Sequence, residues 1–151
     1  MITIYAVGKK HEAWVEPGIL RYLERLHGAF AAEWVLFPHS QFEGNRARED
    51  ESGAMLARLR PTDYVILLDE RGKNLSSPEL SELITNAQAD TKQVVIVIGG
   101  AYGVHDSMHM RAQVVWSLSR LVFPHQLVRL ILAEQLYRSQ AIATNHPYHH
   151  E

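Results

Sequence analysis

Hydrophobic and polar residues alternate in blocks along the chain, and these blocks predict strands and helices in turn. Short, mainly apolar runs are typical of strands buried on both faces of a sheet, and they lie at Ile2–Val7, Glu33–Phe37, Tyr64–Leu68, Gln93–Gly100 and Val114–Ser119. Helical patterns lie between these runs, and a last helix begins near Pro124. We therefore predict one α/β domain over residues 1–151, with a mostly parallel sheet covered by helices on both faces.

Three loops of this sheet are candidate binding segments, because ligands of open α/β sheets bind beyond the carboxyl ends of the strands. The loops follow Leu68, Ile98 and Ser119. The second of them, GGAYGVHD, is rich in glycine, which lets the backbone turn sharply and approach a ligand closely. Its spacing matches neither a dinucleotide fingerprint nor a P-loop. A simple tight turn between strand and helix is an equally good interpretation.

The third loop is unusual because Leu121, Val122 and Phe123 are consecutive and apolar. A solvated loop rarely has such a composition. Two interpretations stay open. The loop is buried under the last helix, or it lines a pocket for a partly apolar ligand such as an adenine ring, and both can be true.

The last helix carries apolar residues on more than one face, at Leu127, Val128, Leu130, Ile131, Leu132 and Leu136. This apolar surface is wider than packing on one sheet face requires, so the helix is either central or shared between subunits. We predict a homodimer, since symmetric dimers are the commonest assemblies of identical chains.

Composition narrows the class of protein. With 151 residues, 46% hydrophobic and 21% charged, the chain is globular. It has no cysteine, which excludes disulfides and thiolate zinc sites. No apolar run approaches the roughly 20 residues that span a bilayer, and the start lacks a signal-peptide pattern. We therefore predict a cytoplasmic protein with no membrane contact.

Charge is unevenly distributed. The net charge of −2 argues against a general nucleic-acid binder. However, the segment Arg111–His150 contains four arginines, four histidines and one acidic residue, Glu134. The chain ends in NHPYHHE, whose three histidines have no cysteine and no cluster of acids close by, so we predict no metal site. Tyrosine and histidine beside basic residues instead suit stacking on a nucleic-acid base and contact with phosphate.

Four segments of the chain resemble one family. They are ITIYAVGK at the start, VVIVIGGAYGV, WSLSRLVFPHQLVRLILAEQLYRSQAI and the final NHPYHHE. The family is the ribosomal RNA large-subunit methyltransferase H family, whose members are small SPOUT, or trefoil-knot, methyltransferases. The resemblance covers essentially the whole chain in order and length. It implies an α/β knot over approximately residues 64–145, whereas general topology rules alone predict an ordinary open sheet.

The resemblance also implies an activity. The family methylates N3 of a pseudouridine in the helix 69 stem-loop of 23S rRNA within the ribosome, uses S-adenosylmethionine as methyl donor, and functions as a homodimer. Carried over by position, the cofactor contacts are Leu68, Gly99, Leu118, Ser119, Arg120, Leu121, Val122 and Phe123. The predicted substrate contacts are Arg138, Tyr148, His149 and His150. Two positions depart from many relatives: His150 replaces an arginine or lysine, and Tyr102 replaces an acidic or amide residue.

Methyl transfer to an imide nitrogen needs alignment of donor and acceptor and the loss of one weakly acidic proton, without a metal. His149 is the candidate for accepting that proton. Alternatively, His149 only positions the base and water takes the proton. Two other functions stay open: methylation of another rRNA or tRNA atom by a trefoil-knot enzyme, and a non-catalytic flavodoxin-like module that binds a phosphate-bearing ligand.

Overall fold

Strands from the whole length of the chain form one parallel sheet. The computed structural model describes residues 1–8, 10–90 and 92–150. The strands are β1 (Ile2–Val7), β2 (Ala32–Phe37), β3 (Tyr64–Asn74), β4 (Val94–Ile98) and β5 (Val114–Ser117). They lie in the order β2-β1-β4-β3-β5, and every neighbouring pair is parallel. The predicted parallel sheet is thereby confirmed.

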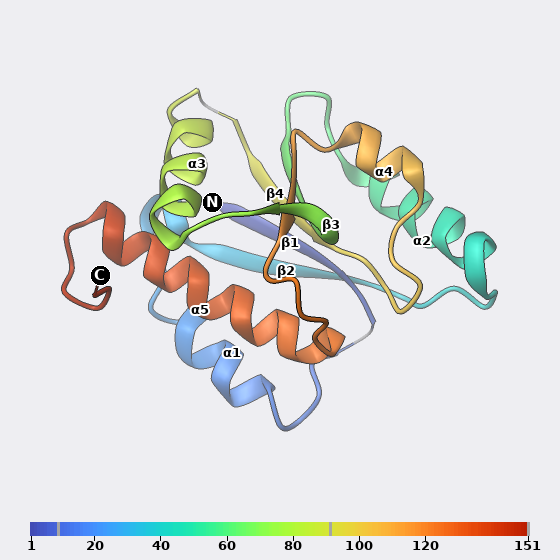
Figure 1. The fold of residues 1–151 in the computed structure, drawn as a ribbon, viewed down its shortest axis with the longest axis horizontal. Coiled ribbons are helices and arrows are strands. Elements are labelled where there is room, and N and C mark those ends of the chain that lie inside the picture. Colours follow the sequence, from blue (N-terminus) through green and yellow to red (C-terminus); the bar gives the residue numbers. More distant parts are fainter. Residues whose placement is uncertain (9, 91, 151) are drawn as a thin grey trace.

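Helices cover both faces of the sheet, as predicted (Figure 1). On one face lie α1 (Glu16–Leu23), a 3-10 turn η1 (Gly28–Phe30), α3 (Ser77–Ala89) and α5 (His125–Ala143); on the other lie α2 (Gly44–Arg58) and α4 (Asp106–Arg111). Successive strand residues point to opposite faces. Thus Ile4 joins the core beneath α3 and α5, whereas its neighbour Tyr5 joins the core beneath α2 and α4.

Strand β3 is longer than the predicted strand Tyr64–Leu68, because it resumes after an irregular stretch. Both Leu68 and Lys73 align with Trp116 of β5, and the residues between them bulge from the sheet. Gly72 touches the backbone of β5 there, since a β-carbon on it would lie 2.5 Å from the carbonyl carbon of Val115. The residues after Leu68 are mostly polar, which is typical of a loop, so the hydrophobic pattern did not predict the second half of this strand. Threading of the C-terminal segment through an earlier loop stays a prediction.

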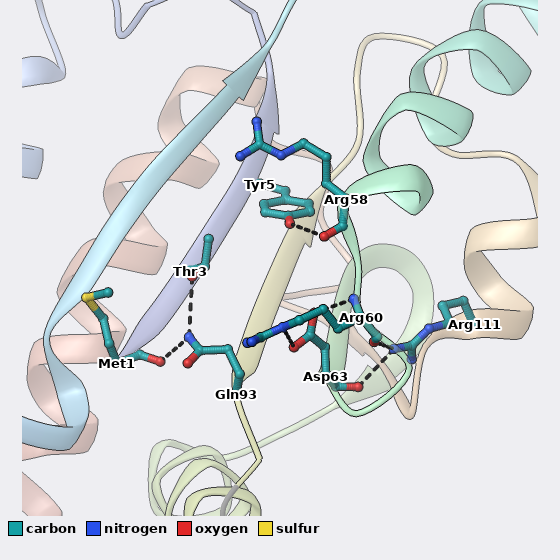
Figure 2. A network of polar contacts seen from close by, with 8 residues as sticks. All are labelled: Met1, Thr3, Tyr5, Arg58, Arg60, Asp63, Gln93 and Arg111. Carbon is teal, nitrogen blue, oxygen red and sulfur yellow. Dashed lines mark hydrogen bonds and ion pairs between the residues drawn. The ribbon is translucent and has the colours of Figure 1, made fainter.

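A polar network closes the amino-terminal end of the sheet (Figure 2). The backbone N–H of Arg60 donates to the buried Asp63 carboxylate at 2.7 Å, and Arg111 donates to the Asp63 carbonyl at 3.0 Å. Gln93 donates to the carbonyl of Met1 beside them. Arg111 therefore acts at the end of the sheet opposite the candidate loops. The basic C-terminal segment does not form one continuous surface.

Candidate cofactor and substrate sites

The three loops predicted from the sequence meet around one cavity of about 380 Å³, the first cavity, at the carboxyl ends of β3, β4 and β5. Seven of the eight predicted cofactor residues line it: Leu68, Gly99, Leu118, Ser119, Leu121, Val122 and Phe123. Arg120 belongs to the same loop but is exposed and is not part of the lining. The structure thus brings together residues that are up to 55 positions apart in the sequence.

Glycine shapes the wall of the first cavity between β4 and α4. Gly103 has φ +80°, and its N–H donates to the carbonyl of Gly100 at 3.0 Å. A β-carbon on Gly99 would lie 2.7 Å from a methyl group of Val104. The sequence suggested that glycine is needed for close approach of a ligand. The structure gives a different reason at Gly99, because a side chain there would force the turn itself apart.

The loop between β5 and α5 forms an apolar rim. The Ser119 hydroxyl accepts a hydrogen bond from the N–H of Leu121 at 3.0 Å and so holds the turn. Leu121 is 70% exposed and Val122 is 80% exposed, and both line the first cavity. Of the two interpretations left open by the sequence, burial beneath the last helix is therefore wrong for these two side chains. They form a pocket wall at the protein surface.

Sequence reasoning missed a histidine–arginine pair at the base of the first cavity. His125 lines the cavity, and its Nε2 accepts a hydrogen bond from Nε of Arg129 at 3.1 Å. A guanidinium only donates, so the proton of the neutral ring lies on Nδ1. Burial, together with the charge of Arg129, lowers the pKa of His125 to about 4. The spacing of histidine and arginine, one helical turn apart after Pro124, was the available signal.

Arg129 is completely buried and anchors the end of β1. Its Nη2 donates to the carbonyl of Val7 at 2.8 Å, and its Nη1 donates to the carbonyl of Lys10 at 3.2 Å and to Nδ1 of His11 at 3.1 Å. Burial lowers the pKa of Arg129, and the charge of Glu12 partly offsets this effect. The arginine therefore ties the loop after β1 to the helix that carries His125.

A second cavity of about 430 Å³ adjoins the first and is lined mainly by polar residues. Asp69 lines both cavities. Its carboxylate accepts hydrogen bonds from the backbone N–H of Arg71 at 2.8 Å and from Arg71 Nε at 3.2 Å, and it lies 3.3 Å from Nε2 of His109. Burial by itself raises the pKa of Asp69, but these hydrogen bonds and charges together outweigh that effect. The pKa therefore lies below its ordinary value, and the group stays ionised.

The C-terminal tail turns back over the end of α5. Asn145 has φ +56°, and the N–H of His146 donates to the carbonyl of Ala141 at 2.8 Å, as in a helix-ending Schellman motif. This turn places the Tyr148 ring 4.8 Å from the guanidinium carbon of Arg138. His150 is exposed, and Glu151 lies outside the described residues.

Glu134 holds the tail residues together. Its carboxylate accepts hydrogen bonds from Arg138 Nη2 at 2.5 Å and from the Tyr148 hydroxyl at 3.2 Å. Nη1 of Arg138 lies 3.2 Å from Nδ1 of His149. Burial raises the pKa of Tyr148 to about 12, together with a hydrogen bond to Tyr22 and the charge of Glu134. The Tyr148 hydroxyl therefore stays protonated at neutral pH and can donate a hydrogen bond.

The predicted substrate residues and the predicted cofactor residues lie at opposite ends of α5 within one chain. His125, at the start of the helix, lines the first cavity, whereas the tail folds against its last turns (Figure 1). A helix of 19 residues spans about 28 Å. The tail of a chain therefore does not contact the first cavity of the same chain in this structure.

Residues 1–8, 10–90 and 92–150 contain neither a metal-binding cluster of side chains nor a membrane-spanning helix. Within those ranges, no three histidine, aspartate or glutamate side chains gather closely enough to hold a metal ion. No helix in this part of the chain is long and apolar enough to cross a membrane.

Over residues 1–149 the chain matches the protein family described as "Predicted SPOUT methyltransferase". It is also similar to proteins named ribosomal RNA large subunit methyltransferase H. It is 42% identical to the protein of Geotalea daltonii over 99% of both chains. Identity is 40% to the protein of Pelotomaculum thermopropionicum and 38% to that of Gloeobacter violaceus, in each case over 99% of this chain and 98% of the relative.

Solved structures resemble this fold at much lower identity. A "probable methylase family protein" from Haemophilus influenzae Rd KW20 superposes with a TM-score of 0.57 at 12% identity, over 99% of this chain and 70% of that one. A "probable rRNA-methyltransferase" from Porphyromonas gingivalis superposes with a TM-score of 0.57 at 13% identity, over 94% and 68%. At such identities the likeness concerns the fold alone.

Proposed function

Because the chain belongs to the SPOUT methyltransferase family, we propose that it methylates N3 of a pseudouridine in the helix 69 loop of 23S rRNA, with S-adenosylmethionine as methyl donor. The observation that carries this proposal is the similarity, at 38–42% identity over almost the full length, to proteins named ribosomal RNA large subunit methyltransferase H. Family membership confirms the resemblance predicted from the sequence. The target atom rests on the resemblance of the C-terminal motif.

The first cavity has the chemical character that S-adenosylmethionine requires. The apolar rim of Leu121, Val122 and Phe123 suits the faces of an adenine ring, and the backbone of the surrounding turns suits its polar edge. When bound, S-adenosylmethionine supplies a methyl group on a positively charged sulfonium. The ionised Asp69 lines the same cavity and favours a cation there. The residues present therefore fit this donor, and Arg120 is left outside its contacts.

His149 has a defined proton position that bears on its role. Because a guanidinium only donates, Nδ1 of His149 accepts from Arg138, and the proton of the neutral ring lies on Nε2. In this tautomer the ring is a hydrogen-bond donor. Nε2 is buried in this structure, so we propose that the tail shifts on contact with RNA and that Nε2 then donates to a carbonyl oxygen of the target base. This hydrogen bond would stabilise the negative charge that grows as the imide proton leaves. Accepting that proton through Nδ1 would require release from Arg138.

A homodimer would bring the two ends of α5 together. The tail does not reach the first cavity of its own chain, so we propose that the tail of the partner completes the site. Leu121 and Val122 are exposed, and Leu127 and Ile131 on the following helix α5 are half-buried. Exposed apolar side chains of this kind are suited to covering by a second copy of the chain. Each site would then combine the first cavity of one subunit with Arg138 and Tyr148 of the other.

Methylation of purified ribosomes tests the proposed function. Large subunits from cells that lack this protein are incubated with it and labelled S-adenosylmethionine, and 23S rRNA fragments are mapped by mass spectrometry. We expect one added methyl group on a pseudouridine in the helix 69 loop. A methyl group on a ribose, on another 23S nucleotide or on tRNA would instead support the alternative target. The Gly99→Val variant, whose side chain opens the turn beside Val104, serves as the inactive control.

A further inference from the structure

The second cavity has no role in the methyl transfer proposed above. It lies between the start of α2, the bulge of β3 and the loop before α4, and Arg48, Arg71 and His105 line it from these three elements. It shares with the first cavity a wall that includes Asp69 and Glu70. A polymer whose reacting unit meets the methyl donor at the first cavity can therefore extend along the second.

Arg48 is held in place at this cavity by contacts on two sides of its guanidinium. Its Nε donates to the carbonyl of Tyr102 at 2.7 Å, and its Nη1 donates to the side-chain oxygen of Asn45 at 3.4 Å. A guanidinium that is already oriented loses little side-chain entropy on binding, and its planar fork matches the oxygens of a phosphate. Tyr102, which is 45% exposed, lines the same cavity.

Acidic residues restrict which phosphate fits. Asp69, Glu70 and Asp106 also line the second cavity, although Asp69 is engaged by Arg71. These carboxylates repel the dense charge of a nucleoside di- or triphosphate, whereas a phosphodiester carries a single charge. Carboxylates also accept hydrogen bonds from hydroxyl groups, and the ribose 2′-hydroxyl is the group that distinguishes RNA from DNA. The combination favours an RNA backbone over a free nucleotide.

We infer that the second cavity is a subsite for the RNA strand beside the target nucleotide, where Arg48 binds a backbone phosphate and Tyr102 stacks on a base. This inference rests on the proposed function, from which it takes the RNA substrate.

Arg48→Gln tests the phosphate contact. We expect the KM for large ribosomal subunits to rise about tenfold, and the salt dependence of RNA binding, as the slope of log K against log salt concentration, to fall by about one. Affinity for S-adenosylmethionine, measured by calorimetry, should stay within about twofold, because Arg48 does not line the first cavity. Arg48→Lys should recover most of the salt slope, since the charge is retained.

Arg46→Gln is the matched control. Arg46 lies on the same helix and is exposed, its guanidinium stacks on Phe42 at 3.7 Å, and it does not line the second cavity. Its replacement removes the same charge from the same region and should leave KM and salt slope unchanged. Tyr102→Leu should raise KM several-fold with an unchanged salt slope, because stacking is lost and charge is not.

The subsite is overturned if Arg48→Gln and Arg46→Gln change KM and salt slope equally, or if neither variant changes them. It is also overturned if a loss of affinity for S-adenosylmethionine accounts for the whole effect of Arg48→Gln. The wild-type protein reports separately on the proposed function. The wild-type protein could bind the large subunit with a salt slope that depends on Arg48 and yet transfer no methyl group to 23S rRNA. In that case the proposed reaction is wrong and the proposed RNA subsite is supported. If the wild-type protein methylates normally and Arg48→Gln matches it, the subsite alone fails.

Discussion

Two arginines of the same helix, Arg129 and Arg138, are bound in opposite ways. Arg129 is completely buried, and its donors reach two backbone carbonyls and two histidine nitrogens. Arg138 is 25% exposed and pairs with Glu134, which lies one helical turn earlier. Burial lowers the pKa of Arg129, whereas the hydrogen bond that Arg138 donates to Glu134 raises the pKa of Arg138.

The difference separates a structural anchor from an exchangeable contact. Two of the acceptors of Arg129 are backbone carbonyls, which cannot leave without disrupting the end of β1 and the loop after it. The partners of Arg138 are side chains on the helix surface and in the tail, and such contacts contribute little to stability. They can be replaced by contacts with an RNA base or phosphate at small cost. One helix thus holds a fixed end at the first cavity and an adaptable end at the tail.

Removal of the tail should have the largest effect, and it tests the adaptable end. We expect deletion of Tyr148–Glu151 to lower the rate of methylation at least a thousandfold, because the deleted residues supply the aromatic and imidazole contacts to the base. Affinity for S-adenosylmethionine and the free energy of unfolding should remain nearly unchanged. Single-turnover kinetics and calorimetry measure these quantities. A large loss of stability would show that the tail is part of the folded core, which would contradict the division between the Arg129 anchor and the exchangeable contacts of Arg138.

Replacement of each arginine by methionine compares the two ends directly. Arg129→Met should lower the free energy of unfolding by about 3 kcal/mol, because buried carbonyls lose their donor. Arg138→Met should lower it by less than about 1 kcal/mol, as for a partly exposed ion pair, while the rate of methylation falls. Urea unfolding measures both stabilities. Equal losses of stability would contradict the division between anchor and exchangeable contact.

Mixed dimers test which subunit supplies the tail that completes each site. His149→Ala and Gly99→Val should each be inactive as homodimers. If the tail of one subunit serves the first cavity of the other, a heterodimer of the two variants contains one intact site and recovers about half of the wild-type activity. Purification through two different affinity tags ensures that heterodimers are assayed. A heterodimer without activity would show that each chain uses its own tail.

A smaller effect is expected from pH at the fixed end. The pKa of His125 is about 4 in the folded protein, below its ordinary value of 6.5. Between these values the unfolded chain binds a proton that the folded chain does not, so stability falls as the pH drops from 6.5 to 4. His125→Asn keeps an acceptor for Arg129 and removes the proton-binding site. Urea unfolding at several pH values should therefore show a shallower pH dependence in this variant, and an identical dependence would exclude the His125 contribution.

The sequence predicted the strands well because buried parallel strands are continuously apolar. Val94–Ile98 is entirely buried, and the predicted run Gln93–Gly100 contains it with one extra residue before it and two after it. The second half of β3 was missed, since contact with β5 depends on Gly72 and not on hydrophobic side chains. Periodicity located the three loops of the first cavity, whereas the cofactor assignments came from the family resemblance.

Other parts of the candidate sites left little trace in the sequence. Arg48 and Tyr102 are 54 positions apart and meet only through the fold. The segment Arg111–His150 is locally basic in the sequence, but the fold places Arg111 at one end of the sheet and buries Arg129. The position of the tail at the far end of α5 depends on the left-handed turn at Asn145, which local patterns did not reveal.

The order of the strands has a consequence for synthesis of the protein. Strand β1 is made first, but one of its edges pairs residue 2 with residue 94, at the start of β4. That edge stays without its neighbour while residues 38–93 are translated, which takes roughly 3 to 11 s at bacterial elongation rates. Unpaired strand edges promote association between nascent chains. We therefore expect the yield of soluble recombinant protein to depend on chaperones. The yield should improve at a growth temperature at which aggregation is slowed more than translation is.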